Sequence, residues 1–105
     1  MSRTYSEAFL IELHKANPNR AGTALALACV KANLPAKYVA EALEVTRMTV
    51  FSWFRGKPIR HKNMLKVETL TDLIESDTAK GFLPAKNTAA AKLYLEDMVG
   101  RKFDN

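Results

Sequence analysis

Apolar residues recur along most of this chain at intervals of three and four, the spacing that gathers them on one face of a helix. Phe9, Leu10 and Leu13 show this pattern near the start of the sequence. It returns farther along at Leu65, Val67, Leu70, Leu73 and Ile74. We expect this second set to lie in the core. No segment alternates apolar and polar residues as a half-buried strand would. The sequence therefore predicts an all-α protein, a compact bundle of about five or six short helices.

Capping and helix-breaking residues set the expected boundaries in the first third of the chain. Ser6 is a suitable N-cap for a first helix that runs to about Ala16. An Asn-Pro-Asn break at residues 17–19 separates it from a second helix, which runs to about Ala32 and is rich in small residues. Pro35 fits the first turn of a third helix, where its missing N–H is harmless.

The second half of the chain predicts two further helices. The first spans about residues 62–76 and the second spans residues 87–99, ending before a glycine. The segment between them, residues 77–86, contains glycine and proline and is expected to be an ordered loop. We expect Phe82 and Leu83 to be tucked beneath this loop.

Residues 36–56, AKYVAEALEVTRMTVFSWFRG, have the spacing that two short helices crossing at a tight turn require. Ala40 is small, as needed where the helices approach most closely, and Thr46 is a suitable N-cap for the second helix. The larger apolar residues that would fill the space around the crossing are Val39, Leu43, Val45, Val50 and Trp53. Polar residues lie between them and face outward. Such a helix-turn-helix is typical of DNA-binding proteins.

The length and composition restrict the class of protein. With 105 residues, 48% of them hydrophobic and 26% charged, the chain suits one globular domain. Its single cysteine, Cys29, excludes a disulfide framework and a cysteine-rich zinc site. No apolar run is long enough for a signal peptide or a membrane span. We therefore expect a cytoplasmic protein with no membrane partner, associated with the nucleoid, or in the host cytoplasm if the protein is viral.

The positive charge of the chain is concentrated around the helix-turn-helix. The whole sequence has 16 Lys and Arg against 11 Asp and Glu, a net charge of +5. Six basic and two acidic residues, Glu41 and Glu44, fall within residues 35–62, so this segment holds four of the five net charges. A basic cluster can be only a solvated face, but its coincidence with the motif favours contact with phosphate.

Residues 20–75 resemble the lambda repressor and Cro type of helix-turn-helix protein, the Xre-like group of phages and bacteria. The residues that carry the resemblance are Ala40, Leu43, Val45, Thr46, Val50 and Trp53, followed by Arg55-Gly56-Lys57-Pro58. Glu44 departs from the family pattern, which has glycine at this turn because the residue there tends to adopt a positive φ. A non-glycine residue at positive φ costs on the order of 1 kcal/mol.

The resemblance implies a recognition helix from Thr46 to Arg55, whose first turn lies nearest the base edges of the major groove. The residues it assigns to base reading are Arg47, Met48 and Ser52, with Thr46 placed to bond a phosphate or a base, and we add Phe51 to this set. Arg47 can donate two hydrogen bonds to guanine, and Met48 can pack on a thymine methyl group. The alternative for Arg47 is an exposed arginine paired with Glu44.

A second set of residues would flank the groove and contact phosphates, which positions the protein without reading sequence. This set consists of Lys37, Thr49, Arg55, Lys57, Arg60, His61 and Lys62. The backbone amides at the start of the helix that follows Pro35 could add a further phosphate contact.

Phe51 and Phe54 flank Trp53 at positions that face outward in a typical recognition helix, so something should cover them. Phe51 could contact thymine methyl groups, and Phe54 could be covered by the first helix through Phe9 or Leu13. Alternatively, both rings are partly buried within the domain. A third possibility is that this aromatic face binds another protein.

The sequence gives no sign of an enzyme. Its two histidines, one cysteine and scattered carboxylates lack the spacing of a metal site, a catalytic triad or a phosphate-binding loop. We expect Cys29 to be a small buried residue on an apolar helix face and His14 to be solvated. No cofactor and no metal are implied.

The preferred hypothesis is a sequence-specific transcription regulator, a repressor of phage or bacterial type that binds double-stranded DNA as a homodimer on two half-sites about one helical turn apart. Residues 1–19 would be an N-terminal extension and residues 77–105 a possible dimerisation element. Its apolar stripe, either core or partner surface, consists of Ala91, Leu95, Met98 and Val99. The alternatives are a protein-interaction module, for example a phage protein that binds a host polymerase or nuclease, and a DNA architectural or packaging protein.

Overall fold

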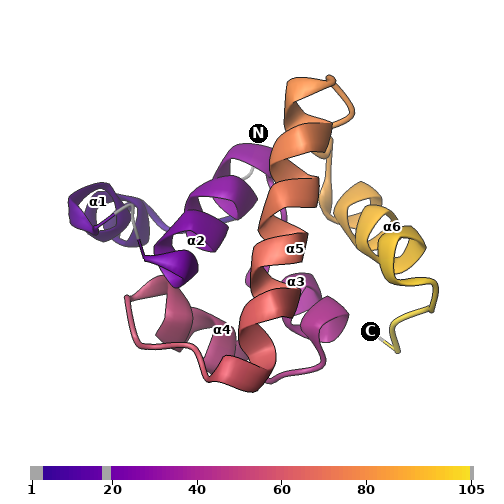
Figure 1. Cartoon of the computed structure of the whole chain (residues 1–105). Helices are drawn as coiled ribbons and strands as arrows, with labels where there is room; N and C mark the ends of the chain where they lie inside the picture. The colour runs from indigo at the N-terminus through magenta and orange to yellow at the C-terminus, as the bar shows by residue number, and fades with distance from the viewer. Residues whose placement is uncertain (1–3, 18–19, 105) are drawn as a thin grey trace.

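The computed structural model describes residues 4–17 and 20–104, and these form six α-helices (Figure 1). The helices are α1 (Glu7–Lys15), α2 (Ala21–Ala32), α3 (Ala36–Leu43), α4 (Arg47–Phe54), α5 (His61–Ala79) and α6 (Thr88–Val99). No strand occurs among the described residues. The predicted all-α bundle of about five or six helices is confirmed. Pro18 and Asn19 of the predicted break lie outside the described residues.

Polar side chains cap the starts of three of the helices, and two of these caps, Ser6 and Thr46, were expected from the sequence. The side chains of Ser6, Thr46 and Asn87 accept hydrogen bonds from the backbone N–H groups three residues ahead. Two expected starts are corrected by one residue. Pro35 is the N-cap of α3 rather than part of its first turn, and Asn87 is the N-cap of α6 rather than its first residue.

The core draws side chains from the whole described chain. α2 packs against α5 and α4, while α3 packs against α4 and α6. Leu25, Val39 and Ile74 are fully buried at the centre. The two terminal segments also enter the core. Their buried apolar residues are Tyr5, Leu13, Leu83, Ala85, Ala91, Leu95 and Phe103. α6 and the segment after it therefore complete the core by covering α3.

α5 is longer than predicted, and its apolar residues divide between two faces. It starts at His61 and extends to Ala79. Residues 77–79, which were expected in the loop, therefore belong to the helix. Val67, Leu70 and Ile74 are buried, but Leu65 is 75% exposed and Leu73 is 44% exposed, against expectation. At 100° per residue, Leu65 points about 200° away from Val67, which turns it toward solvent.

Of the two residues expected beneath the loop after α5, only one is buried. Leu83 lies in the core, whereas Phe82 is 72% exposed. The loop instead joins the core through Ala85, whose N–H donates to the carbonyl of Ala32. The Asn33 side-chain amide donates to the Ala85 carbonyl at 2.8 Å. These two bonds attach the loop to the end of α2 and leave Phe82 at its outer edge.

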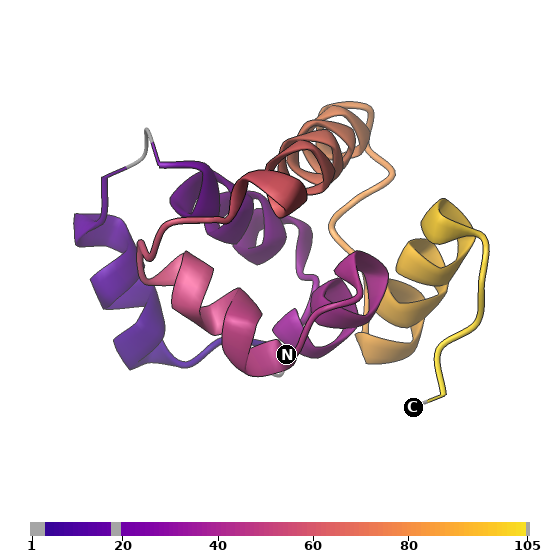
Figure 2. The same cartoon turned by 60° about the horizontal axis from the view of Figure 1, so that its bottom comes forward.

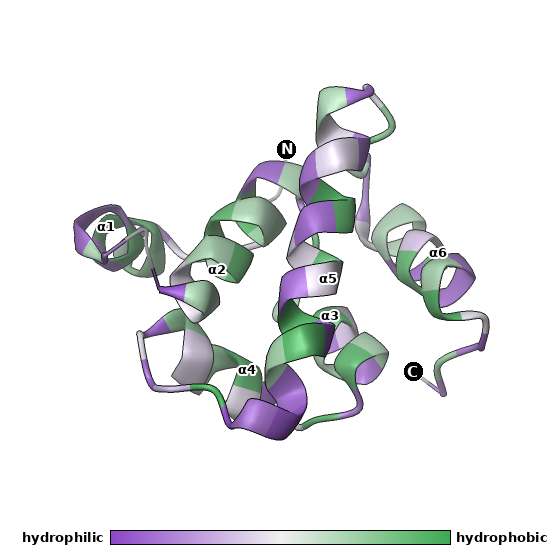
Figure 3. Ribbon diagram, viewed as in Figure 1, coloured by the Kyte–Doolittle hydropathy of each residue, from purple (hydrophilic) through white to green (hydrophobic). Residues whose placement is uncertain are grey.

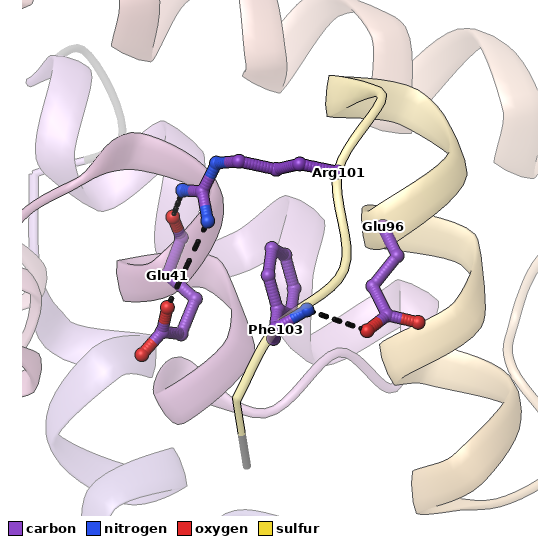
Figure 4. Close-up of polar contacts among 4 residues, drawn as sticks. All are labelled: Glu41, Glu96, Arg101 and Phe103. Carbon is purple, nitrogen blue, oxygen red and sulfur yellow. Dashed lines mark hydrogen bonds and ion pairs between the residues drawn. The ribbon is translucent and has the colours of Figure 1, made fainter.

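The segment after α6 crosses back over α3 (Figure 4). The guanidinium of Arg101 donates to the carbonyl of Glu41 and lies 4.0 Å from its carboxylate. The N–H of Phe103 donates to Oε2 of Glu96 at 2.6 Å. The Phe103 ring stacks on Tyr38, with centroids 6.3 Å apart and planes 15° apart. α3 is thus held between α4 and the C-terminal segment. In the described part of the chain no helix has the length and apolar character to cross a bilayer.

Candidate nucleic-acid interface

α3 and α4 are joined by a tight turn in which Glu44 adopts φ 60° and ψ 42°, the left-handed conformation. The chain leaves α3 through two backbone bonds, from Glu44 N–H to the carbonyl of Glu41 and from Val45 N–H to that of Ala40. This pattern ends helices with a left-handed residue, usually glycine. The positive φ expected at this turn is therefore present, with glutamate in the place that glycine fills at lower cost.

The residues expected at the crossing of the two helices are buried there. Val39 and Val50 are fully buried, and Ala40 is 3% exposed. Leu43 and Trp53 are also buried, and Val45 is half-buried against the core. The steric interpretation of the sequence is confirmed, because every large apolar residue assigned to this wedge contributes to the core.

α2 crosses α4 so closely that only glycine fits at the contact. A Cβ atom added to Gly22 would lie 2.2 Å from the carbonyl oxygen of Trp53. Beside this contact, the Arg20 guanidinium donates to the carbonyl of Gly56 at 3.0 Å. The sequence reasoning missed both Gly22 and Arg20. A lone glycine inside a helical pattern was an available signal for the first.

An aromatic cluster covers the side of α4 that faces α1. Phe54 is 1% exposed, and its ring centroid lies 6.0 Å from that of Phe9 and 6.3 Å from that of Tyr5. Phe9 also meets Phe51 edge-on at 5.9 Å. The Tyr5 hydroxyl, buried among these rings, donates to the carbonyl of Leu34. Burial raises the pKa of Tyr5, so this donor stays protonated.

This cluster decides between the alternatives for the two phenylalanines. Phe54 is covered by the first helix through Phe9, as one alternative expected. It is therefore unavailable as part of a protein-binding face, and that assignment is wrong for Phe54. Phe51 is half-buried and keeps only part of its ring open to a partner.

The exposed side of α4 presents the other residues assigned to base reading. Arg47 is exposed, and Met48 is 81% exposed although it is apolar. Within residues 4–17 and 20–104, Arg47 has no hydrogen bond or ion pair, so the alternative pairing with Glu44 is absent. Ser52 is half-buried on the same helix.

Thr46 and Thr49 form one unit at the start of α4. The hydroxyl of Thr46 accepts from the N–H of Thr49 at 3.1 Å, and the two hydroxyl oxygens lie 2.8 Å apart. The Thr46 oxygen is thus engaged in capping the helix, although the residue remains exposed. Thr49, assigned to phosphate contact, is half-buried.

The basic residues assigned to phosphate contact are all exposed. Lys37 lies in the first turn of α3, with its Nζ atom 5.5 Å from the centre of the Tyr38 ring. The others lie along the segment from the end of α4 to the first turn of α5, namely Arg55, Lys57, Arg60, His61 and Lys62. Figure 2 shows this segment and α4 on one side of the molecule, and in Figure 3 the lower end of α5 is hydrophilic.

One other expectation, for Cys29, can be placed in the structure. Cys29 is fully buried, as expected of a small core residue, and burial raises the pKa of its thiol. Among the described residues no cluster of three or more His, Cys, Asp or Glu side chains could hold a metal ion.

The stripe of α6 considered as a dimer surface is mostly core. Ala91 and Leu95 are fully buried because α6 packs on α3. Their assignment to a homodimer interface is wrong. Met98 is half-buried and Val99 is 36% exposed, so only the last turn of the helix is available to a partner.

Comparison of the chain with protein-family models, with curated proteins and with solved structures gives no match. The described residues define an all-helical protein in which α3 and α4 form a helix-turn-helix. The resemblance to the lambda repressor type rests on the residues of the sequence alone.

Proposed function

We propose that this protein is a sequence-specific, DNA-binding transcription regulator, a repressor of phage or bacterial type, that reads the major groove with α4. One observation carries the proposal. The outer side of α4 presents Arg47, which is exposed and has no hydrogen bond or ion pair among the described residues, and Met48, which is 81% exposed. Basic residues lie beyond the end of α4 and on the neighbouring helix α3. A helix so exposed, and so flanked by positive charge, suits a groove lined by phosphates.

In this proposal Arg47 reads sequence most strongly, since its guanidinium matches two acceptors of guanine and is worth about 1–3 kcal/mol of discrimination. Met48 packs on a thymine methyl group. Ser52 and the open part of Phe51 contact bases farther along the groove. Thr46 contributes chiefly by fixing the first turn of the helix through its bond to Thr49, which sets the direction of Arg47.

The phosphate contacts come from Lys37 on one side of α4 and from the segment of residues 55–62 on the other. If about five of these groups neutralise phosphates, the logarithm of affinity should fall against the logarithm of salt concentration with a slope of roughly −4 to −5. One domain of this size makes few base contacts, so pairing of two copies would raise specificity.

The first experiment is selection of bound duplexes from a random pool, followed by titration of the recovered and a scrambled duplex at several salt concentrations. We expect Arg47→Ala to bind both duplexes nearly alike, because it removes base reading and keeps phosphate contacts. Lys57→Ala should weaken binding to both equally and reduce the salt slope by about 1.

Lys80→Ala is the matched control, because Lys80 is an exposed lysine at the opposite end of α5 from α4. It removes the same charge and should change neither the preference nor the slope. Equal, weak binding of the wild-type protein to every duplex would sink the regulator hypothesis. Such a result would favour an architectural or packaging role.

The alternative of a protein-interaction module rests on the 81% exposure of Met48, together with the part of Phe51 that stays open on the same helix. Methionine adapts to varied apolar partners. Because Phe54 is buried in the core, it adds no apolar area that such a partner could cover. An absence of DNA binding at low salt, where phosphate contacts are strongest, would favour the interaction module.

A further inference from the structure

The side of α5 turned away from the core carries an apolar stripe that the DNA-binding proposal does not use. Leu65, Thr69 and Leu73 follow one another at intervals of four residues and are all exposed. Beside them runs a groove of about 380 Å³ between α5, α3 and the end of α6. Its apolar wall includes Ala42, Leu65, Leu73, Met98 and Val99. An exposed apolar patch of this kind often marks a site where another protein binds.

The stripe has a symmetric order. Leu65 and Leu73 each lie four residues from Thr69, which is smaller than either of them. If two copies of α5 packed antiparallel about a two-fold axis near Thr69, Leu65 of each copy would meet Leu73 of the other. The smaller Thr69 would lie where the two helices approach most closely. A second copy of α5 would thus place a leucine opposite each of the two leucines of the first.

The charges of α5 and its N-cap are divided in a way that favours the same arrangement. Residues 60–66 contain Arg60, Lys62 and Lys66 and no acidic residue. The second half, residues 68–77, contains Glu68, Asp72, Glu75 and Asp77 and no basic residue. Antiparallel packing places the basic end of each helix beside the acidic end of its partner. Parallel packing would place like charges together, which opposes association.

We propose that the occupant of this surface is a second copy of the chain, bound through an antiparallel α5–α5 contact that also covers Met98 and Val99. This contact replaces the α6 interface that the burial of Ala91 and Leu95 rules out. The patch is small beside the roughly 800 Å² that each partner contributes to a standard interface. The dimer should therefore be weak, with a Kd of tens of micromolar or above.

The pairing is tested without DNA by sedimentation equilibrium of the purified full chain. Leu65→Asp and Leu73→Lys should each weaken self-association at least tenfold, because either places a charge against leucine at both contacts. An equimolar mixture of these two variants should associate again. In the mixed dimer one contact has opposite charges facing each other, and the other retains leucine against leucine. Recovery on mixing is specific to antiparallel pairing.

Leu93→Asp is the matched control, since Leu93 is a 52% exposed leucine on α6 that does not line the groove. It should leave self-association unchanged. Far-UV circular dichroism verifies that each variant is folded. A wild-type protein that stays monomeric up to roughly 1 mM would overturn the proposal. So would a dimer that is insensitive to both stripe substitutions, or two variants that do not associate when mixed.

Discussion

α2 lies close against α4 at Gly22, and this contact predicts whether a larger residue there raises or lowers the free energy of unfolding. Replacing Gly22 with alanine adds a Cβ atom that would lie 2.2 Å from the carbonyl oxygen of Trp53 and 2.8 Å from its carbonyl carbon. Ordinary van der Waals contact begins at 3.4 Å, so the shortest contact is 1.2 Å too close. The obstacle is the backbone of α4, which cannot rotate away as a side chain could.

Two opposing effects determine the magnitude. Alanine is favoured over glycine inside a helix by about 1 kcal/mol. Overpacking a tight core costs typically 1–3 kcal/mol, and the upper end applies here because α2 and α4 must separate as rigid bodies. The net loss in the free energy of unfolding should be about 2 kcal/mol. For a domain of this size that lowers Tm by roughly 10 °C.

Urea unfolding followed by far-UV circular dichroism measures this loss. Ala24→Gly, in the same helix, is the matched control, because it reverses the propensity change without a close contact and should cost about 1 kcal/mol. An unfolding midpoint for Gly22→Ala equal to or above that of the wild type would refute the reasoning. It would mean that α2 and α4 can move apart freely and that helix propensity alone decides the outcome.

Three further substitutions and one labelling experiment test other parts of the fold. Glu44→Gly should raise the free energy of unfolding by about 1 kcal/mol in urea titrations, because glycine adopts φ 60° without strain. Asn33→Gly should give no such gain although φ is 59° there, since the lost side chain bonds the Ala85 carbonyl. Phe54→Ala should cost about 3–5 kcal/mol, measured in the same way, and a smaller loss would contradict its central place in the aromatic cluster. Cys29, with a raised pKa and full burial, should react with a thiol reagent only as fast as the protein unfolds, and rapid labelling of the native protein would contradict its burial.

The sequence predicted those parts of the fold that local chemistry determines. Ser6 and Thr46 were recognisable as caps because their side chains satisfy N–H groups only three residues away. The helix-turn-helix was recognisable because its small and large residues have fixed spacings within 21 positions. Even the positive φ of Glu44 could be expected, since the turn requires it whatever residue is present.

The parts that could not be predicted depend on contacts between distant segments. Leu65 and Leu73 belong to the same helical pattern as Val67, and only the position of α2 decides which face of α5 is buried. Likewise, burial of Ala91 and Leu95 follows from the docking of α6 on α3, 50 residues earlier in the chain. The same distinction between local pattern and distant contacts applies to the candidate site. Arg47 and Met48 were placed correctly on the outer surface, whereas the covering of Phe54 depended on α1.

The burial of Trp53 also makes the protein its own optical probe. It is the single tryptophan of the chain, it lies in α4, and it is 4% exposed where α2 crosses that helix. Its emission wavelength therefore reports whether α4 is seated on the core. A ligand that binds only the outer face of α4 should leave the emission blue-shifted, whereas one that lifts the helix should shift it to the red. Fluorescence of a single residue can thus separate binding by a rigid helix from binding that remodels it.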